Sequence, residues 1–140
     1  MPEPNCSSPG VRIDLLPGAY AVCRLPAGAP VPTLPTDGGI HGHGHVYSLT
    51  VTAREISIVC PETDAPAWSE VDGGWSALII AGPIPFDLAG VLVSVLAPLS
   101  NAGLGVFALS TFESDVVLVR AATLDRAIDL LTAAGHTVRV

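Results

Sequence analysis

The sequence predicts an α+β fold built of two related halves, and three observations point to it. The chain has 140 residues, enough for one domain or for two small halves that share a core. Its second half shows apolar patterns typical of alternating strands and helices in the order βαββαβ. Its first half repeats part of that pattern at an offset of 60 residues. We therefore expect two modules in tandem.

The second half begins with a strand and a helix. The run WSALIIAG (75–82) is apolar and too short for a buried helix, so it predicts a strand. The following FDLAGVLVSVLAPLSNAG (86–103) predicts a helix that ends at Gly103, because glycine readily takes the left-handed conformation found after a helix. Within this helix Pro98 is expected to produce a kink or to tighten its end.

A hairpin, a second helix and a last strand complete this half. GLGVFALST (103–111) and DVVLVR (115–120) are β-rich and are joined by the short link FES. TLDRAIDLLTAAG (123–135) predicts a helix that has Thr123 as its N-cap and stops at Gly135. HTVRV (136–140) predicts a terminal strand. This order is that of a ferredoxin-like sandwich.

The first half carries a degenerate copy. LTVTAREISIVC (49–60) aligns with LSTFESDVVLVR (109–120), so we expect two hairpins of one design. The aligned pairs are Leu49 with Leu109, Thr50 with Ser110, Glu55 with Asp115, Ile58 with Leu118, and Val59 with Val119. YAVCRL (20–25) would correspond to the strand at 75–82, and RIDLLPG (12–18) adds a strand before it.

The first half lacks a counterpart of the first helix. AGAPVPTLPTDGGIHGHGH (27–45) is too rich in proline and glycine to sustain a hydrogen-bonded helix, and the second helix is reduced to about PETDAPAW (61–68). We therefore expect an N-terminal tail (1–10), a degenerate module (11–73) with a His-rich loop (36–45), and an intact module (74–140).

Charge and composition exclude several functions. The formal net charge of −7 disfavours nucleic acids and anionic membranes as partners, since both attract basic surfaces. The chain contains no lysine and neither a Walker loop nor a GxGxxG motif, so we expect no nucleotide or other cofactor. The N-terminus MPEPNCSSPG does not resemble a secretion signal, and the three cysteines show no CxxC spacing. We expect a soluble, cytoplasmic protein.

Neither catalysis nor metal binding is the expected function. The sequence contains no GxSxG or HExxH motif, and no nucleophile pattern accompanies His136. His41, His43 and His45 in HGHGH are an alternative metal site, because imidazole is a common ligand of zinc, nickel and copper. The intervening glycines make the segment flexible, and an exposed variable loop is the favoured interpretation.

The tandem pattern resembles a known family. LLPGAYAVCRLPAGAPVP, SLTVTAREISIVCPE, GPIPFDLAGVLVSVLAPLSNAG and ALSTFESDVVLV together resemble ACT-domain proteins related to the regulatory part of aspartate kinases and to CASTOR-type amino-acid sensors. The resemblance implies a non-catalytic regulatory module. It also implies that a small ligand, usually an amino acid, binds at an interface between ACT modules, and that the chain acts on a regulated enzyme or signalling protein. We further expect a homodimer, because the intact second module offers a sheet edge and an apolar helix surface that the degenerate first module does not fully cover.

The resemblance also implies where the ligand binds. One wall corresponds to the turn before the helix, and the facing wall to the following hairpin. The residues of the turn are Phe86, Asp87, Leu88, Ala89 and Gly90, and those of the hairpin are Ala108, Leu109, Ser110, Thr111, Ser114 and Asp115. Free N–H groups at a helix start can bind a carboxylate, and a carboxylate such as Asp115 can bind an ammonium group.

Each of these residues also has a structural interpretation. Asp87 is equally suited to cap the helix, in which case its charge would compete with a ligand carboxylate for the same N–H groups. The polar residues of the hairpin are equally suited to stabilise its turn. A module that interacts with other proteins and has no ligand remains the alternative function.

Overall fold

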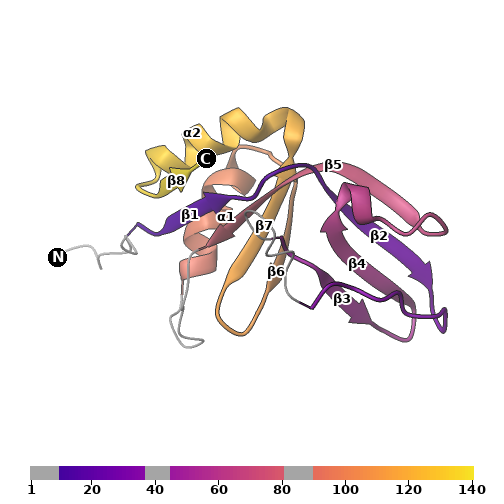
Figure 1. Ribbon diagram of the computed structural model, residues 1–140. Helices are drawn as coiled ribbons and strands as arrows, with labels where there is room; N and C mark the ends of the chain where they lie inside the picture. Colours follow the sequence, from indigo (N-terminus) through magenta and orange to yellow (C-terminus); the bar gives the residue numbers. More distant parts are fainter. Residues whose placement is uncertain (1–9, 37–44, 81–89) are drawn as a thin grey trace. The chain divides into compact units, whose positions relative to one another are not determined.

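A computed structural model describes residues 10–36, 45–80 and 90–140 (Figure 1). Its elements confirm the α+β class, with strands and two α-helices in the described residues. Neither of these helices has the length and apolar character needed to cross a membrane.

The chain divides into two compact units. One unit is continuous and comprises Leu16–Ser76. The other is discontinuous and joins Met1–Leu15 to Ala77–Val140. The longest strand, β5 (Glu70–Ile80), runs out of the first unit into the second, so each unit contains part of it. The predicted boundary between the two modules, at residues 73 and 74, stays a prediction. The compact units are defined by contacts within the fold, so they do not test where one sequence repeat ends and the next begins.

The described residues of the unit Leu16–Ser76 (16–36 and 45–76) contain the strands of a ferredoxin-like module without its α-helices. β2 (Tyr20–Pro26) pairs antiparallel with β4 (Glu55–Pro61) and with the first part of β5, and β3 (Ser48–Val51) pairs with β4. The resulting order, β3-β4-β2-β5, is that of strands two, three, one and four of the split βαβ motif. In place of the second helix there is a single 3-10 turn, η1 (Glu62–Asp64).

Irregular segments cover the apolar face of this sheet. The buried cluster on that face consists of Ala21, Cys23, Leu25, Ile56, Ile58 and Cys60. The side chains packed against it come from the proline-rich segment, from β3 and from the region after η1: Ala29, Leu34, Tyr47, Leu49 and Ala65. The two buried cysteines are free, as expected for thiols that fill a core. The proline-rich segment therefore supplies apolar cover that a helix supplies in a complete module.

Two tyrosines attach that covering segment. The Tyr20 hydroxyl accepts a hydrogen bond from the Val46 N–H at 3.0 Å. The Tyr47 hydroxyl donates to Asp64 Oδ2 at 2.7 Å. Tyr20 is fully buried on β2, and Asp64 belongs to η1. The two bonds fix the end of the segment, residues 46 and 47, to a strand and to the 3-10 turn.

The discontinuous unit has helices on one face of its sheet. α1 (Val91–Asn101) and α2 (Leu124–Ala133) pack on the face that carries Val117 and Val119 of β7 (Asp115–Arg120). β7 pairs with β6 (Val106–Ser110) and with β5, and the last strand is β8 (Thr137–Arg139). A short 3-10 turn, η2 (Ala121–Thr123), precedes α2. The core of this unit includes Ile13, Leu78, Ile80, Val91, Val95, Leu99, Ala127 and Leu131.

The first strand of the chain belongs to the discontinuous unit. β1 (Arg12–Leu15) lies between β5 and β8, antiparallel to β5 and parallel to β8. The sequence correctly predicted a strand here, but it was expected to extend the first half. Ile13 explains the difference, because its side chain is fully buried in the core beneath the helices. In the described residues β8 pairs with β1 alone.

The helix boundaries differ from those expected at one end. α1 begins at Val91 and not near residue 86. Its N-cap is Gly90, with φ of 90°, so Gly90 lies before the helix in the left-handed region. Glycine enters that region without the steric cost that a Cβ imposes. Gly103 and Gly135 follow the two helices with positive φ, which confirms both predicted ends.

Candidate functional site

The hairpin between β6 and β7 carries the described part of the predicted ligand site. Ser110 and Asp115 are opposite one another where the turn begins, and the Ser110 hydroxyl donates to Asp115 Oδ1. Inside the turn, the Thr111 N–H donates to the Ser114 carbonyl at 2.8 Å, and the Ser114 N–H donates to Thr111 Oγ1 at 3.0 Å. The two hydroxyls are 2.7 Å apart. Each of the four polar residues therefore has a partner within the turn.

The pleat separates the predicted wall into two faces. Asp115 has the same parity as Val117 and Val119, so Asp115 and its partner Ser110 lie on the face that the helices cover. Ala108 shares that face, whereas Leu109 points to the opposite face, opposite Val116. Leu109 and Asp115 therefore cannot contact the same small ligand on one side of the sheet.

The start of α1 is at the same end of the sheet. A helical connection returns the chain, so β5 and β6 run in the same direction and their carboxyl ends lie together. The turn after β6 and the loop that leads from β5 into α1 both follow such ends. Glycine has no side chain, so Gly90 as the N-cap cannot bond through one to the first N–H groups of α1. Within the described residues, a helix start without a side-chain cap and a carboxylate thus occur at one end of one face.

Most of the other predicted wall cannot be described. Phe86, Asp87, Leu88 and Ala89 lie outside the described residues. The N-cap position is occupied by Gly90, so the expectation that Asp87 caps α1 is not confirmed. The predicted binding role of the turn and of the hairpin stays a prediction.

Sequence reasoning missed Phe112 in this hairpin. Its side chain is 80% exposed at the tip of the turn, between the braced residues Thr111 and Ser114. The aligned segment of the first half has Thr52 or Ala53 at this position, and that contrast was the available signal. An exposed aromatic ring at a braced turn can offer apolar contact to a ligand or to another protein.

Of the His-rich loop (36–45), the structure describes only the first and last residues, Thr36 and His45. His41 and His43 lie outside the described residues. The His45 ring has Nδ1 3.5 Å from the Tyr20 hydroxyl and meets the Tyr47 ring edge-on, with centroids 6.4 Å apart. Within residues 10–36, 45–80 and 90–140 no three His, Cys, Asp or Glu side chains are grouped as metal ligands would be. His45 therefore contacts Tyr20 and Tyr47, the two tyrosines that attach this end of the loop.

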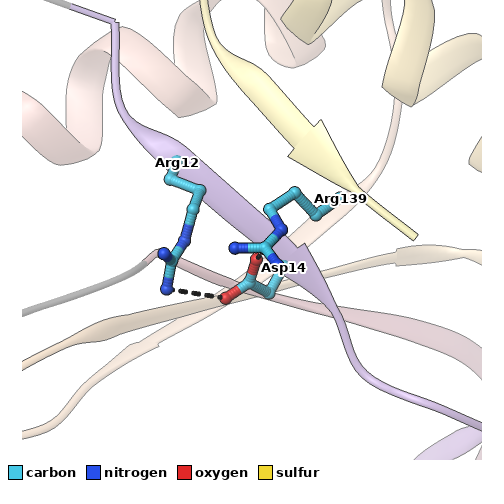
Figure 2. Close-up of polar contacts among 3 residues, drawn as sticks. All are labelled: Arg12, Asp14 and Arg139. Atoms are coloured by element: carbon cyan, nitrogen blue, oxygen red, sulfur yellow. Dashed lines mark hydrogen bonds and ion pairs between the residues drawn. The ribbon is translucent and has the colours of Figure 1, made fainter.

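A second charged cluster lies on β1 and β8. Figure 2 shows the guanidinium groups of Arg12 and Arg139 next to the Asp14 carboxylate. Arg12 Nη2 is 3.4 Å from Oδ2 of Asp14, and Arg139 Nε is 3.9 Å from Oδ1. Both arginines are more than half exposed, so these ion pairs contribute little to stability. The Arg139–Asp14 pair adds a contact between the neighbouring strands β8 and β1.

Comparison with known proteins identifies relatives of the whole chain. Residues 70–133 match the ACT domain family. The crystal structure of protein Atu0741 from Agobacterium tumefaciens is 38% identical, with a TM-score of 0.80, over 94% of this chain and 93% of that one.

Aspartate kinases share the fold at low identity. The ligand-free regulatory subunit of aspartate kinase from Thermus thermophilus is 12% identical, with a TM-score of 0.54, over 87% of this chain and 93% of that one. Aspartate kinase from Clostridium acetobutylicum, described as an allosteric enzyme, is 12% identical, with a TM-score of 0.58, over 84% of this chain and 32% of that chain.

Proposed function

The chain belongs to the ACT-domain proteins, and from this premise we propose that it is a non-catalytic regulatory module that binds an amino acid or a similar small metabolite. In this proposal ligand occupancy is passed to a partner, either a regulated enzyme or a signalling protein. The protein would act in the cytoplasm and as a homodimer.

One observation carries the choice of ligand class. On the helix-bearing face, Asp115 presents a carboxylate at the end of the sheet where α1 begins, and no described residue caps that helix start with its side chain. The N–H groups of the first helical turn favour a carboxylate, and Asp115 favours an ammonium group. A molecule with both groups a few ångströms apart, such as an α-amino acid, matches this pair of charges.

The test begins with a search for the ligand. Thermal unfolding is measured with each common amino acid, because a ligand that binds only the folded state raises its stability by RT ln(1 + [L]/Kd). We expect a rise in Tm with one amino acid or a few related ones. A screen in which no amino acid changes Tm would favour a protein-interaction module without a ligand.

The site is then tested with Asp115→Asn. Asparagine keeps an oxygen that accepts the Ser110 hydroxyl, so the hairpin is retained while the charge is lost. We expect affinity for the ligand found in the screen to fall by about 1.5 to 3 kcal/mol, as for a hydrogen bond to a charged group. Glu113→Gln removes the same charge from an exposed position of the same turn and should leave affinity unchanged. Equal affinities in calorimetry for the wild type and Asp115→Asn would remove Asp115 from the site.

Substitution of Gly90 is a poorer test than the sequence suggests. The left-handed conformation of Gly90 would strain any side chain, and a branched residue such as valine most of all. Loss of binding in Gly90→Val could therefore come from a displaced helix start and not from a blocked ligand. Asp115→Asn removes a ligand contact without altering the helix start, so it separates these two causes. Gly90→Val changes both at once and does not.

A further inference from the structure

His136 is a buried, titratable side chain that the proposed function does not use. It is 5% exposed and lies between α1 and the residues that precede β1. Its Nε2 is 2.9 Å from the Ser94 carbonyl oxygen in the first turn of α1, and its Nδ1 is 3.2 Å from the Val11 nitrogen. Both ring nitrogens are therefore engaged, and their partners belong to segments that are far apart in the chain.

The two partners fix the roles of the ring nitrogens. The Val11 N–H can only donate a hydrogen bond, so Nδ1 must accept it and carries no proton. The Ser94 carbonyl can only accept, so Nε2 must donate to it. A neutral imidazole has one donor and one acceptor and satisfies both partners. An imidazolium has two donors, and the added proton on Nδ1 would point at the Val11 N–H.

The charged groups on the surrounding elements do not face the ring. α1 has no charged residue, and the charged residues of α2 are exposed: Asp125, Arg126 and Asp129. The charged residues of β1 and β8 alternate with Ile13 and Val138, which pack in the core, so they lie on the other face of the strands: Arg12, Asp14 and Arg139. Among the described residues no carboxylate is thus placed to stabilise an imidazolium at position 136.

We propose that His136 is an acid-sensitive switch: a proton taken up by Nδ1 breaks the bond to Val11 and releases the residues before β1 from the turn before β8. The Thr137 N–H donates to the Val11 carbonyl at 3.0 Å and would lose its partner in the same step. A displaced ring would also leave the Ser94 carbonyl without a donor, because residue 98 is a proline and has no N–H. The switch lies within the discontinuous unit and needs no ligand.

The released state and the intact contact therefore respond differently to acid. An imidazole in an unfolded segment takes up a proton below about pH 6.5, whereas the intact contact has no place for that proton. The released state binds one proton more, so its population rises as the pH falls. One such proton raises the equilibrium constant for release about tenfold between about pH 7.5 and 5.5. Asp and Glu titrate near pH 4, so this range isolates the histidine.

Native-state hydrogen exchange at both pH values, corrected for intrinsic exchange rates, measures the release. We expect the protection factors of the Val11 and Thr137 amides to fall about tenfold at the lower pH, and those of β2 and β4 to change less. His136→Gln keeps an N–H donor but does not titrate in this range, so its protection factors should be equal at both pH values. The triple variant His41→Ala, His43→Ala, His45→Ala removes the other three histidines and should respond like the wild type.

Other outcomes overturn the proposal. Equal protection of the Val11 and Thr137 amides at both pH values would show that acid does not release them. An equal fall in His136→Gln would assign the effect to another group, and an equal fall throughout both units would mean global unfolding in place of local release. Circular dichroism verifies that each variant is folded. If His136→Gln does not fold, the nitrogen chemical shifts of the wild-type ring decide the question, because Nδ1 must gain its proton together with the loss of amide protection.

Discussion

Pro98 and His136 form an arrangement that neither residue explains alone. A residue at position 98 would normally donate its N–H to the Ser94 carbonyl, but proline has no N–H to donate. His136 is buried, and its Nε2 is 2.9 Å from the Ser94 carbonyl, where it takes the place of the missing donor. Its Nδ1 accepts the Val11 N–H at 3.2 Å, so the ring is held as the neutral tautomer with its proton on Nε2. The side chain of His136, the residue before β8, thus joins α1 to Val11, the residue before β1.

A double-mutant cycle measures this compensation. In the wild-type background, His136→Ala leaves the Ser94 carbonyl without its donor. In Pro98→Ala protein the new N–H of residue 98 can donate to that carbonyl, while the other losses stay the same. We expect His136→Ala to cost about 1 kcal/mol less in the Pro98→Ala background, measured by chemical denaturation. Equal costs in the two backgrounds would show that His136 does not substitute for the helix donor.

The two tyrosines predict a pH dependence at the alkaline end. The hydrogen bond to Asp64, followed by partial burial, raises the pKa of Tyr47 from 10.0 to about 12. Burial also raises the pKa of Tyr20, against the lowering effect of the Val46 N–H. The folded state therefore holds both protons more tightly than the unfolded chain does. This contribution to stability is complete below about pH 10, the unfolded value, and is lost as the pH rises through the folded values.

Spectrophotometric titration tests this dependence. The chain has two tyrosines, so tyrosinate absorbance reports these two groups alone. We expect the native protein to ionise at higher pH than the unfolded chain, and Tyr47→Phe to show one transition in place of two. Tyr47→Phe should also lose part of the alkaline decline in stability. A native titration that coincides with that of the unfolded chain would contradict the bonds assigned to these hydroxyls.

At the scale of elements, the two hairpins have the same turn at an offset of 59 residues. The Thr52 N–H donates to the Glu55 carbonyl at 2.9 Å, and its hydroxyl accepts the Glu55 N–H at 3.1 Å. Thr111 makes the same two bonds with Ser114, at 2.8 and 3.0 Å. The registers agree, because Val51 pairs with Ile56 and Ser110 pairs with Asp115. The prediction of one design is thus supported, but the offset of 60 is wrong by one residue.

The two threonines should therefore be equivalent in energy. Thr52→Val and Thr111→Val keep the shape of the side chain and remove the hydroxyl that receives the turn N–H. We expect each to lower the free energy of unfolding by about 0.5 to 1.5 kcal/mol, the usual value of one hydrogen bond. Chemical denaturation of both variants provides the comparison. A loss confined to one of them would mean that only one turn depends on its threonine.

The error of one residue shows where sequence comparison reaches its limit. An offset of 60 aligns Ile58 with Leu118, which are both apolar and buried. Ile58 belongs to the cluster on the covered face of its sheet, while Leu118 points away from the helices. At an offset of 59 Ile58 aligns with Val117, which does face the helices. A shift of one residue reverses the faces of a strand, and strands buried on both sides give no alternation to reveal it.

Signals of other elements were stronger. The glycines that end both helices, the apolar spacing of α2 and the helix-breaking composition of the described residues 27–36 all predicted what the structure contains. The start of α1 was missed because Gly90 was placed inside the helix, where its left-handed conformation would not fit. Within the candidate site the sequence identified the polar turn, but it could not show that those groups bond to one another. Such pairing depends on register and cannot be inferred from composition.

At the scale of the molecule, the order of the strands along the chain differs from their order in the sheet. β1 comes first in the chain, yet it completes the sheet that contains the last strand. The sequence could not predict this insertion, because the short apolar pattern of 12–15 is compatible with either unit. Contacts around β1 explain its position. The Thr137 N–H donates to the Val11 carbonyl at 3.0 Å, and a Cβ on Gly10 would collide with the Gly135 carbonyl. Val11 also donates to His136, so the first described residues are held by the last turn of the chain.

This arrangement predicts which amides lose protection when the first strand is weakened. Ile13→Ala removes a fully buried side chain from β1 and should cost about 2 to 5 kcal/mol, as truncations in a packed core do. Native-state hydrogen exchange should then show a large increase in the exchange rates of β8, β7 and α2, which share that core. The increase in β2 and β4 should be smaller. Ile58→Ala is the matched control, since it truncates an equally buried isoleucine in the cluster of Leu16–Ser76 and should expose β2 and β4 first. If the amides of β2 and β4 in Ile13→Ala instead lose protection before those of β8, then β1 unfolds together with the unit Leu16–Ser76. The discontinuous unit would then not unfold as one cooperative unit.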